Sequence, residues 1–461
     1  MNEFDVAIIG AGPGGYIAAL RAAQQGLKTC VVEKDQVGGV CLNRGCIPTK
    51  TLLESAKHIN SLKKASEFGI KVSDFQIDAL RIWQRKNQVV ENLRKGIEYL
   101  FKARGVNFIK GEAKLVANDT VEVKSDSGTL QLKAKNIILA TGSSPFELPD
   151  LKFDHKLILS SDDILDLSRI PKSLIIVGGG VIGCEFASLF SSLGTSITIV
   201  ELMENLLSLE DREISKTLEM SFKKKGIGIK TRTKLESVKH KEIGVEACLS
   251  DGTKINSELI LVCVGRKPNA DILGLEKVKV KAEVKGGWIK VDDCLRTNVE
   301  NVYAIGDVTG KILLAHVASR QAEIAVENIL GHNKQIDYSA VPNCIFTFPE
   351  VSSVGISEAK AKELNLDYSI AKFPFRVLGK SHTVGETEGF LKLLIDRKTE
   401  LILGAHIIGP DATGLIAELT LAMKNKLKAG LITETIHAHP TFSEIIPETV
   451  FSFLNIPLHT V

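Results

Sequence analysis

Two cysteines five positions apart, Cys41 and Cys46, are the residues of this sequence best suited to carry out chemistry. On a regular α-helix, residues i and i+5 lie about 8.6 Å apart at Cα, whereas a disulfide needs a Cα separation of about 4.4–6.8 Å. A bridge therefore requires a bend, and Gly45 and Pro48 are residues that bend or interrupt a helix. Such a bridge would be strained, and strained, reachable disulfides exchange readily with thiols. The alternative is two ordinary cysteines in a glycine-rich loop.

A lysine follows the cysteine pair at a spacing that matters for thiol chemistry. Lys50 stands four residues after Cys46, and on a helix this spacing places the two side chains on the same face. Its positive charge would favour the thiolate form of Cys46, which is the form that reacts. The segment therefore predicts thiol–disulfide chemistry.

The other six cysteines have the pattern of small buried side chains. Most of them stand in apolar runs, and their spacing matches no secreted disulfide framework. In a reducing compartment, a single close pair is more typical of catalysis than of structural support. The six are Cys30, Cys184, Cys248, Cys263, Cys294 and Cys344.

The segment before the cysteines has the pattern of a dinucleotide-binding unit. An apolar strand over residues 4–9 leads into a glycine-rich turn and a helix that runs to Gln25, and a second strand over residues 28–32 ends at Glu33. Glycines in such a turn let the backbone approach a pyrophosphate at the helix N-terminus, and the acid can accept from ribose hydroxyls. The GxGxxG glycines are Gly10, Gly12 and Gly15.

The same pattern recurs in the middle of the chain. A strand over residues 174–177 precedes a second glycine-rich turn, and a strand over residues 197–200 ends at Glu201, with the same spacing between first glycine and acid as before. Two units predict two dinucleotides, the alternative being one functional site and one decayed copy. Glu201 favours NAD over NADP, because it repels a 2′-phosphate and residues 202–205 contain no arginine. The second set of glycines is Gly178, Gly180 and Gly183.

The length and patterning of the chain predict an α/β protein of about three domains. A chain of 461 residues exceeds what one hydrophobic core usually supports. Prolines between positions 145 and 171 mark one boundary, and the composition changes again near residue 341. The expected ranges are 1–145 for the first Rossmann-like dinucleotide-binding domain, 146–270 for the second, 271–340 for a central segment and 341–461 for a C-terminal α+β domain.

The composition argues against several classes of partner. A net charge of +3 with 25% charged residues does not predict binding to nucleic acid or to an anionic membrane. No apolar run reaches the roughly 18–20 residues that span a bilayer, and the N-terminus enters an apolar strand without a targeting segment. No set of His, Cys, Asp or Glu has zinc-binding spacing, so we expect no metal. These features predict a cytoplasmic protein.

These elements together resemble the flavin-dependent pyridine nucleotide–disulfide oxidoreductases, over essentially the whole chain. Residues 38–48 are similar to the segment of that family that contains its redox-active disulfide, and this resemblance implies a Cys41–Cys46 pair. His439, in the sequence His-Pro-Thr, and Glu444 are similar to the family's catalytic base and the acid that orients it. Thr49 stands where serine is commoner, and the sequence does not assign residues 445–447.

The resemblance also implies the cofactors and the residues that bind them. The first glycine unit would hold the ADP end of FAD and the second would hold NAD, with Lys50 and Glu185 as an ion pair near the flavin ring. The alternative for Glu185 is a solvated charge on a helix. The full set of implied cofactor-binding residues is Gly10, Gly12, Gly15, Glu33, Lys50, Ala113, Ala140, Thr141, Gly142, Asp307, Ala315, Gly178, Gly180, Gly183, Glu185, Glu201 and Gly265.

The resemblance implies an activity and a partner as well. Dihydrolipoyl groups on a 2-oxo acid dehydrogenase or glycine cleavage complex would be oxidised to lipoyl, with electrons passing through Cys41–Cys46 and FAD to NAD⁺. It implies a homodimer in which His439 of one subunit completes the active site of the other, a point that the sequence leaves open. We expect His437 to cap a helix end rather than to serve as a second base. His316 is a candidate contact for the flavin, and the alternative is a histidine with no role in cofactor binding.

Several other activities share parts of this pattern. Glutathione and trypanothione reductases have the cysteine pair but generally use NADPH, which Glu201 disfavours. Mercuric reductase has additional C-terminal cysteines, whereas the last cysteine here is Cys344. Flavin transhydrogenases lack the pair. A non-catalytic binding subunit of a multienzyme complex is the alternative from a different class of function.

Overall fold

The first dinucleotide unit is built on a seven-stranded sheet. The computed structural model describes residues 2–283 and 286–459. The strand order is β3-β2-β1-β6-β5-β4, with β17 paired to the other side of β6. Pairing is parallel among β3, β2, β1, β6 and β17 and antiparallel through the β6-β5-β4 hairpins. The strands are β1 (Asn2–Ile9), β2 (Thr29–Glu33), β3 (Asn107–Lys110), β4 (Glu112–Ala117), β5 (Thr120–Ser125), β6 (Gly128–Leu139) and β17 (Val302–Ala304).

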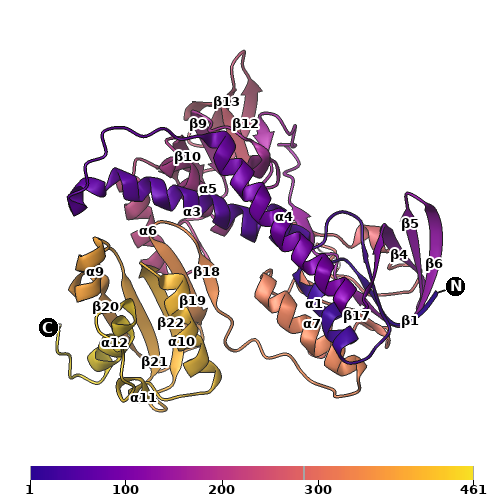
Figure 1. Ribbon diagram of the computed structural model, residues 1–461. Coiled ribbons are helices and arrows are strands. Elements are labelled where there is room, and N and C mark those ends of the chain that lie inside the picture. Colours follow the sequence, from indigo (N-terminus) through magenta and orange to yellow (C-terminus); the bar gives the residue numbers. More distant parts are fainter. Residues whose placement is uncertain (1, 284–285, 460–461) are drawn as a thin grey trace.

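Two helices that are distant in sequence pack together on this sheet. Helix α1 (Pro13–Gln24) follows β1, and α7 (Ala315–Ile329) follows β17. Both contribute to one core with the sheet, in which Ala18, Ala22 and Ala325 are fully buried. These small side chains allow the two helices to approach closely. Figure 1 shows α1 and α7 side by side next to β1 and β17.

The second dinucleotide unit has a smaller parallel sheet of the same type. Its strand order is β11-β10-β9-β15-β8, and a three-stranded antiparallel sheet, β12-β13-β14, lies beside it. Helices α5 (Val181–Ser192) and α6 (Arg212–Lys224) belong to this unit. The strands are β8 (Ile158–Leu159), β9 (Ser173–Val177), β10 (Ser196–Val200), β11 (Gly228–Lys230), β12 (Leu235–His240), β13 (Val245–Leu249), β14 (Lys254–Ser257) and β15 (Leu259–Val262).

A short antiparallel pair joins the two units. Strand β7 (Ser143–Pro145) leaves the first sheet and β16 (Arg266–Pro268) leaves the second, and they pair with each other. Hydrogen bonds between Thr141 and Asn269, in both directions, extend this connection. The chain therefore passes between the units at a single two-stranded crossing.

The C-terminal part of the chain forms a five-stranded antiparallel sheet covered by helices. The strand order is β18-β19-β22-β21-β20. Figure 1 shows it apart from the first sheet, at the other end of the molecule. The elements are β18 (Asn343–Ile345), β19 (Glu350–Gly355), α8 (Glu358–Glu363), β20 (Tyr368–Pro374), α9 (Gly379–Val384), β21 (Phe390–Asp396), β22 (Ile402–Gly409), α10 (Ala412–Lys424), α11 (Gly430–Thr433) and α12 (Ile445–Phe453).

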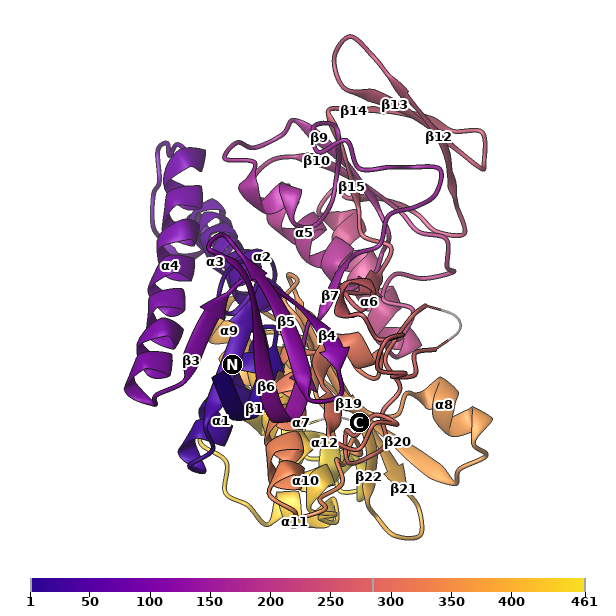
Figure 2. The same cartoon turned by 90° about the vertical axis from the view of Figure 1, so that its right-hand side faces the viewer.

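Two consecutive helices carry the cysteine segment, and a third, longer helix follows them. Helices α2 (Gly39–Arg44) and α3 (Cys46–Lys63) are consecutive, and α4 (Ala79–Ala103) follows them. Leu52 and Leu53 of α3 share a core with Phe186 of α5, which fixes the cysteine segment against the second unit. Figure 2 shows α4 along one edge of the molecule, beside α3. Within the described residues, no helix is long and apolar enough to cross a membrane.

Candidate active site

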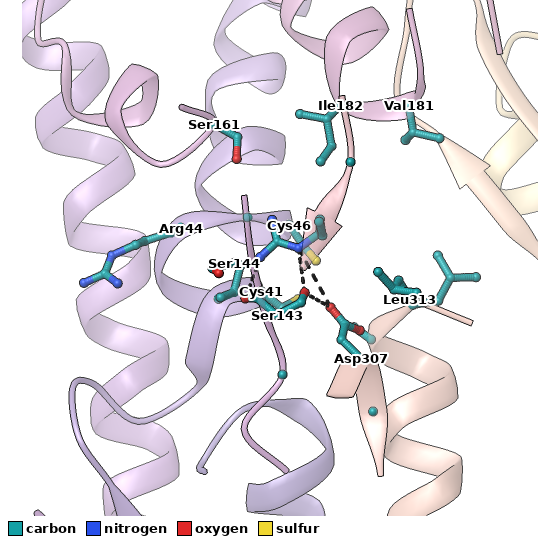
Figure 3. Close-up of a pocket in the computed structure, with 18 of the residues that line it drawn as sticks. Cys41, Arg44, Cys46, Ser143, Ser144, Ser161, Val181, Ile182, Asp307 and Leu313 are labelled. Carbon is teal, nitrogen blue, oxygen red and sulfur yellow. Dashed lines mark hydrogen bonds and ion pairs between the residues drawn. The ribbon is translucent and has the colours of Figure 1, made fainter. Parts of the chain in front are cut away.

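Both cysteines line one large cavity between the two dinucleotide units. The cavity has a volume of about 1770 Å³ and is lined by residues of both glycine-rich turns, of the cysteine segment and of β18. Pockets that bind a single small ligand usually measure about 300–1,000 Å³, so this one has room for more than one ligand. Figure 3 shows Cys41 and Cys46 among the side chains that line it.

The chain bends between the two cysteines at the residue where the sequence predicts a break. Helix α2 ends at Arg44, Gly45 is non-helical with φ −149° and ψ −112°, and α3 begins at Cys46. A Cβ atom built on Gly45 would lie 3.3 Å from the Cα of Cys41, so glycine permits this close turn. Both cysteines are free thiols in the structure.

The surroundings of the two sulfur atoms shift the pKa values of Cys41 and Cys46 in opposite directions. The hydrogen bond from Cys41 and the charge of Lys50 lower the pKa of Cys46 to about 7, against the opposing effects of burial and of Glu185. The same hydrogen bond, together with burial, raises the pKa of Cys41 well above its ordinary value. Because the pair titrates together, one sulfur holds the shared proton while the other carries the charge. Of the reduced pair, Cys46 is therefore the sulfur that more readily carries the charge.

The lysine and glutamate expected to pair do so within this cavity. Lys50 Nζ lies 2.9 Å from Oε1 and 2.8 Å from Oε2 of Glu185, and it also sits 4.7 Å from the ring centroid of Phe346. The Glu185 side chain is only 5% exposed and also accepts a hydrogen bond from the backbone N–H of Phe346. This burial excludes the alternative of a solvated helix charge for Glu185.

The first glycine-rich turn leaves backbone exposed at the N-terminus of α1. A Cβ at Gly10 would lie 2.3 Å from the carbonyl oxygen of Ala140, and one at Gly15 would lie 1.8 Å from that of Gly10. Gly12 lines the cavity as the N-cap of α1, whereas Gly15 does not line it and instead lets the helix pack on the strand. Glu33 accepts a hydrogen bond from the N–H of Ala11 at 2.8 Å. The turn therefore matches the form that holds a pyrophosphate and a ribose.

The second glycine-rich turn repeats this geometry. A Cβ at Gly178 would lie 2.4 Å from the carbonyl oxygen of Cys263 and one at Gly183 would lie 2.0 Å from that of Gly178, whereas Gly180 faces open space. Glu201 accepts hydrogen bonds from the backbone N–H groups of Gly179 at 2.5 Å and of Met203 at 2.7 Å. Every element of the first turn recurs, so the second unit is not a decayed copy.

Two arginines that the local sequence does not indicate approach this second turn. Arg232 and Arg212 both form ion pairs with Glu204, at 2.8 and 3.2 Å, three residues after Glu201. The prediction that residues 202–205 supply no arginine is correct for that stretch but does not describe the folded site. Both guanidinium groups are engaged by the carboxylate of Glu204, whereas Glu201 lines the cavity.

The remaining residues expected to contact cofactor lie around the cavity between the turns. Asp307 accepts a hydrogen bond from the Ser143 hydroxyl at 2.6 Å, as Figure 3 shows. His316 lines the cavity next to Ala315 and bonds the carbonyl oxygen of Pro342. The expected residues that line it are Ala113, Ala140, Thr141, Gly142, Asp307, Ala315 and Gly265.

The expected base and its acid form a pair, but outside this cavity. His439 Nδ1 lies 2.7 Å from Oε1 of Glu444, and Oε2 of Glu444 accepts from the backbone N–H of Thr441 at 2.8 Å. Burial opposes ionisation of Glu444, but the hydrogen bonds from His439 and Thr441 outweigh it and hold its pKa below the usual value. The His439 side chain is 76% exposed, and neither residue lines the cavity with the cysteines.

The expectations for His437 and for three of the six other cysteines need correction. His437 does not cap a helix: its ring contacts the carbonyl oxygen of Thr435 and, at 3.0 Å, the carboxylate of Glu418 on α10, a partner distant in sequence. Cys248, Cys263 and Cys344 are only partly buried, and Cys263 and Cys344 line the cavity.

Some residues of the site could not be assigned from the sequence alone. Residues 445–447 form the first turn of α12, and Ile445 and Ile446 are fully buried in the C-terminal core. Ser143, Arg266 and Phe346 also line the cavity, and no local motif marks them. Among the described residues, no group of His, Cys, Asp and Glu has the geometry of a metal site.

Comparison with models of known protein families shows two matches that together cover most of the chain. Residues 4–322 match the model of the pyridine nucleotide–disulphide oxidoreductases, and residues 341–450 match the dimerisation domain of the same family. The chain belongs to this family. It is therefore an oxidoreductase that couples a pyridine nucleotide to a disulfide, and its C-terminal part is a dimerisation domain.

Its relatives within the pyridine nucleotide–disulphide oxidoreductases are similar over their whole length. The chain is 45% identical to the dihydrolipoyl dehydrogenase of Chlamydia pneumoniae, covering 99% of this chain and 98% of the relative. It is 41% identical to that of Geobacillus stearothermophilus, covering 100% and 98%. Among solved structures, LpdA from Mycobacterium tuberculosis superimposes with a TM-score of 0.92 at 28% identity, covering 98% of this chain and 100% of that one.

A second structural relative is a reductase of disulfides. The HOCl-induced flavoprotein disulfide reductase RclA from Escherichia coli, solved as a Cu(II) complex, has a TM-score of 0.89 at 28% identity, covering 98% of this chain and 99% of that one. The fold and the cysteine-containing cavity are thus those of a flavoprotein disulfide oxidoreductase. The two glycine-rich turns, each with its helix N-terminus and acid, fit the two cofactors of the family, FAD and NAD.

Proposed function

We propose that this protein oxidises protein-bound dihydrolipoyl groups to lipoyl and passes the electrons to NAD⁺. The observation that carries the proposal is the pairing of Cys41 with an acidified Cys46 in the cavity that both dinucleotide turns line. Relatives named dihydrolipoyl dehydrogenase, 41–45% identical over the whole chain, support the choice of substrate. The two carboxylates at the ribose positions, Glu33 and Glu201, support FAD in the first unit and NAD in the second.

Bound FAD would supply a two-electron acceptor between the cysteine pair and NAD⁺. The residues that would hold it are the first glycine turn, Glu33 and Asp307, whose carboxylate accepts hydroxyl hydrogens. Gly178, Gly180 and Glu201 would hold NAD. Lys50 and Glu185 lie in the same cavity, where the buried pair keeps a positive charge next to Cys46.

The cysteines carry out the exchange with the substrate. One substrate thiol gives its proton to His439, and the resulting thiolate attacks the sulfur of Cys41 in the oxidised pair. The Cys41–Cys46 bond breaks, and Cys46 leaves as a thiolate, which its low pKa of about 7 favours. The second substrate thiol then gives its proton to the solvent and, as a thiolate, attacks the substrate sulfur bound to Cys41. This closes the lipoyl ring and releases the sulfur of Cys41, which takes up the proton held by His439. The substrate loses two electrons and the cysteine pair gains them.

Glu444 orients the base in this scheme. A carboxylate only accepts hydrogen bonds, so the contact between His439 Nδ1 and Glu444 requires the proton on Nδ1. The other ring nitrogen, Nε2, is then the one that accepts the substrate proton. Glu444 also stabilises the imidazolium that forms.

The base would act on the cysteines of a second subunit. His439 is exposed and does not line the cavity of its own chain. It belongs to the domain that matches the family's dimerisation domain, whose surface exposes Leu421, Ile436 and Leu458 at 63%, 97% and 75%. A dimer that covers these apolar side chains would bring His439 toward a partner's cavity.

The partner would be a lipoyl-bearing protein of a 2-oxo acid dehydrogenase or glycine cleavage complex. The cysteine spacing matches no secreted disulfide framework, which supports a cytoplasmic setting.

We further propose domain ranges of 1–145, 146–270, 271–340 and 341–461. The sheet topology supports these ranges, because β17 (residues 302–304) pairs with the first sheet and β18 is the first strand of the C-terminal sheet.

The test is a comparison of donor and acceptor pairs with the purified protein. Dihydrolipoamide with NAD⁺ is expected to give rapid NADH formation, and glutathione disulfide with NADPH is expected to give little oxidation of the nucleotide. A preference for glutathione disulfide with NADPH would overturn the proposed substrate, but it would not change the assignment of the chain to its family. A preparation that contains no FAD would overturn the proposed chemistry as a whole.

A further inference from the structure

The hydroxyl of Ser143 joins an arginine from the second unit to an aspartate of the first. Arg266 Nε lies 2.7 Å from Ser143 Oγ, and Ser143 Oγ lies 2.6 Å from Oδ2 of Asp307. Arg266 Nη2 also donates to the backbone carbonyl of Ser143 at 2.8 Å. The guanidinium group therefore holds Ser143 at two points, and its Nε is 4.0 Å from the Asp307 carboxylate.

The three residues come from the crossing between the two dinucleotide units. Ser143 begins β7, Arg266 begins β16, and Asp307 follows β17 of the first sheet. The side chains of Arg266 and Asp307 are 13% and 27% exposed, so their contacts are shielded from most of the solvent. All three residues line the large cavity.

The direction of the hydrogen bonds follows from the donors available. A guanidinium group only donates, so the Oγ of Ser143 accepts from Arg266. The single hydroxyl hydrogen of Ser143 is then left to point toward Asp307, which accepts it on Oδ2. Arg266 thus sets the direction of the Ser143 hydroxyl and, through it, the orientation of the carboxylate, whose Oδ1 receives no hydrogen bond from the described residues.

We propose that Arg266 is a positioning residue for FAD, acting through Ser143 to hold Asp307 with Oδ1 available to a hydroxyl of the flavin cofactor. The inference rests on the proposed role of Asp307 in FAD binding. It also gives the second unit an indirect part in flavin binding, since Arg266 belongs to the strand that leaves that unit. Lysine would not replace Arg266 fully, because an ammonium lacks the fixed geometry that engages both Oγ and the carbonyl oxygen.

The test measures the release of FAD from the holoenzyme by the recovery of flavin fluorescence on dilution. Arg266→Met and Ser143→Ala are each expected to speed FAD release about tenfold, the size expected for one hydrogen bond to a charged group. The double variant is expected to be no faster than either single variant, because both act through the same chain of contacts. Arg266→Lys is expected to be intermediate. Lys267→Met removes an exposed charge from the same strand and serves as the control.

A second measurement separates positioning from a purely structural role. If Arg266 acts on FAD affinity, excess FAD is expected to return the unfolding temperature of Arg266→Met to the wild-type value, by mass action. Unchanged FAD release in both single variants, additive effects in the double variant, or an unfolding temperature that excess FAD does not restore would each overturn the inference. Wild-type protein that contains no FAD would instead contradict the proposed function.

Discussion

His439 Nδ1 lies 2.7 Å from Oε1 of Glu444, yet the imidazole is 76% exposed and does not line the cavity with Cys41 and Cys46. The proposed base is therefore oriented within its own chain but does not line the cavity that holds its own cysteines. In a family with a dimerisation domain, this arrangement is explained most simply by a site shared between two subunits.

Mixed dimers test whether the site is shared. Cys46→Ser and His439→Gln homodimers are each expected to be inactive with dihydrolipoamide and NAD⁺. After the two proteins exchange subunits, a mixed dimer contains one intact cysteine pair facing one intact histidine. Activity is then expected to return to about a quarter of the wild-type value, since half of the dimers are mixed and each has one working site.

The control for the mixed dimers is the Cys46→Ser, His439→Gln double variant. Exchange of this protein with either single variant leaves no site with both groups, so no activity is expected to return. If the single variants also stay inactive after verified subunit exchange, His439 acts within its own chain and the shared site is wrong.

Glu444 is expected to affect turnover rather than cofactor content. Glu444→Gln removes the carboxylate that holds the proton on His439 Nδ1 and that stabilises the imidazolium. We expect kcat with dihydrolipoamide to fall at least about tenfold, with bound FAD and the KM for NAD⁺ unchanged. Glu448→Gln, on the neighbouring helix α12, is the matched control. An unchanged kcat in Glu444→Gln would show that Glu444 does not orient His439 for catalysis.

The low pKa of Cys46 predicts a pH profile for the reduced protein. Alkylation of Cys46 by iodoacetamide is expected to rise with pH around a midpoint near 7, because only the thiolate reacts. Lys50→Met removes the nearby positive charge and leaves Glu185 without its partner, and both changes disfavour the thiolate. The midpoint is therefore expected to move to higher pH.

Lys57→Met is the control for this pH profile, since Lys57 is an exposed charge on the same helix, α3. Its midpoint is expected to match the wild type. A Lys50→Met protein whose alkylation midpoint does not move would show that Lys50 does not favour the Cys46 thiolate.

Glu201 is expected to determine the choice of nucleotide. Its carboxylate accepts from the N–H groups of Gly179 and Met203 and repels a 2′-phosphate. Glu201→Gln is expected to raise the KM for NAD⁺ about tenfold and to narrow the preference for NAD⁺ over NADP⁺. Glu236→Gln, an exposed charge on β12, is the control. If the ratio of kcat/KM for NAD⁺ to that for NADP⁺ does not change, residues other than Glu201 determine the choice between the two nucleotides.

The parts of the site that depend on local sequence could be predicted. Each glycine turn, with its strand, helix and acid, falls within about 30 residues, and the break at Gly45 follows from the spacing of the cysteines. The parts that depend on distant residues could not. The contact of His437 with Glu418 spans 19 positions and two elements, so a local pattern suggested a helix cap instead.

The hydrogen bonds that join Arg266, Ser143 and Asp307 also could not be predicted from local sequence patterns. Ser143 and Arg266 are separated by 123 positions, and Asp307 lies 164 positions from Ser143, so only the folded crossing of β7 and β16 brings them together. Arg212 and Arg232 reach Glu204 in the same way, from a helix and a loop outside the motif. Cofactor motifs are local in sequence, whereas the residues that orient them are not.

The most direct measurement for the central claim is NAD⁺ reduction by dihydrolipoamide in Cys46→Ser protein that retains its FAD. In the proposed mechanism Cys46 passes the electron pair onward from the substrate, so this variant is expected to form no NADH while its flavin absorbance stays the same. Substantial NADH formation by the FAD-containing variant would contradict the account, since electrons would then reach NAD⁺ without the cysteine pair.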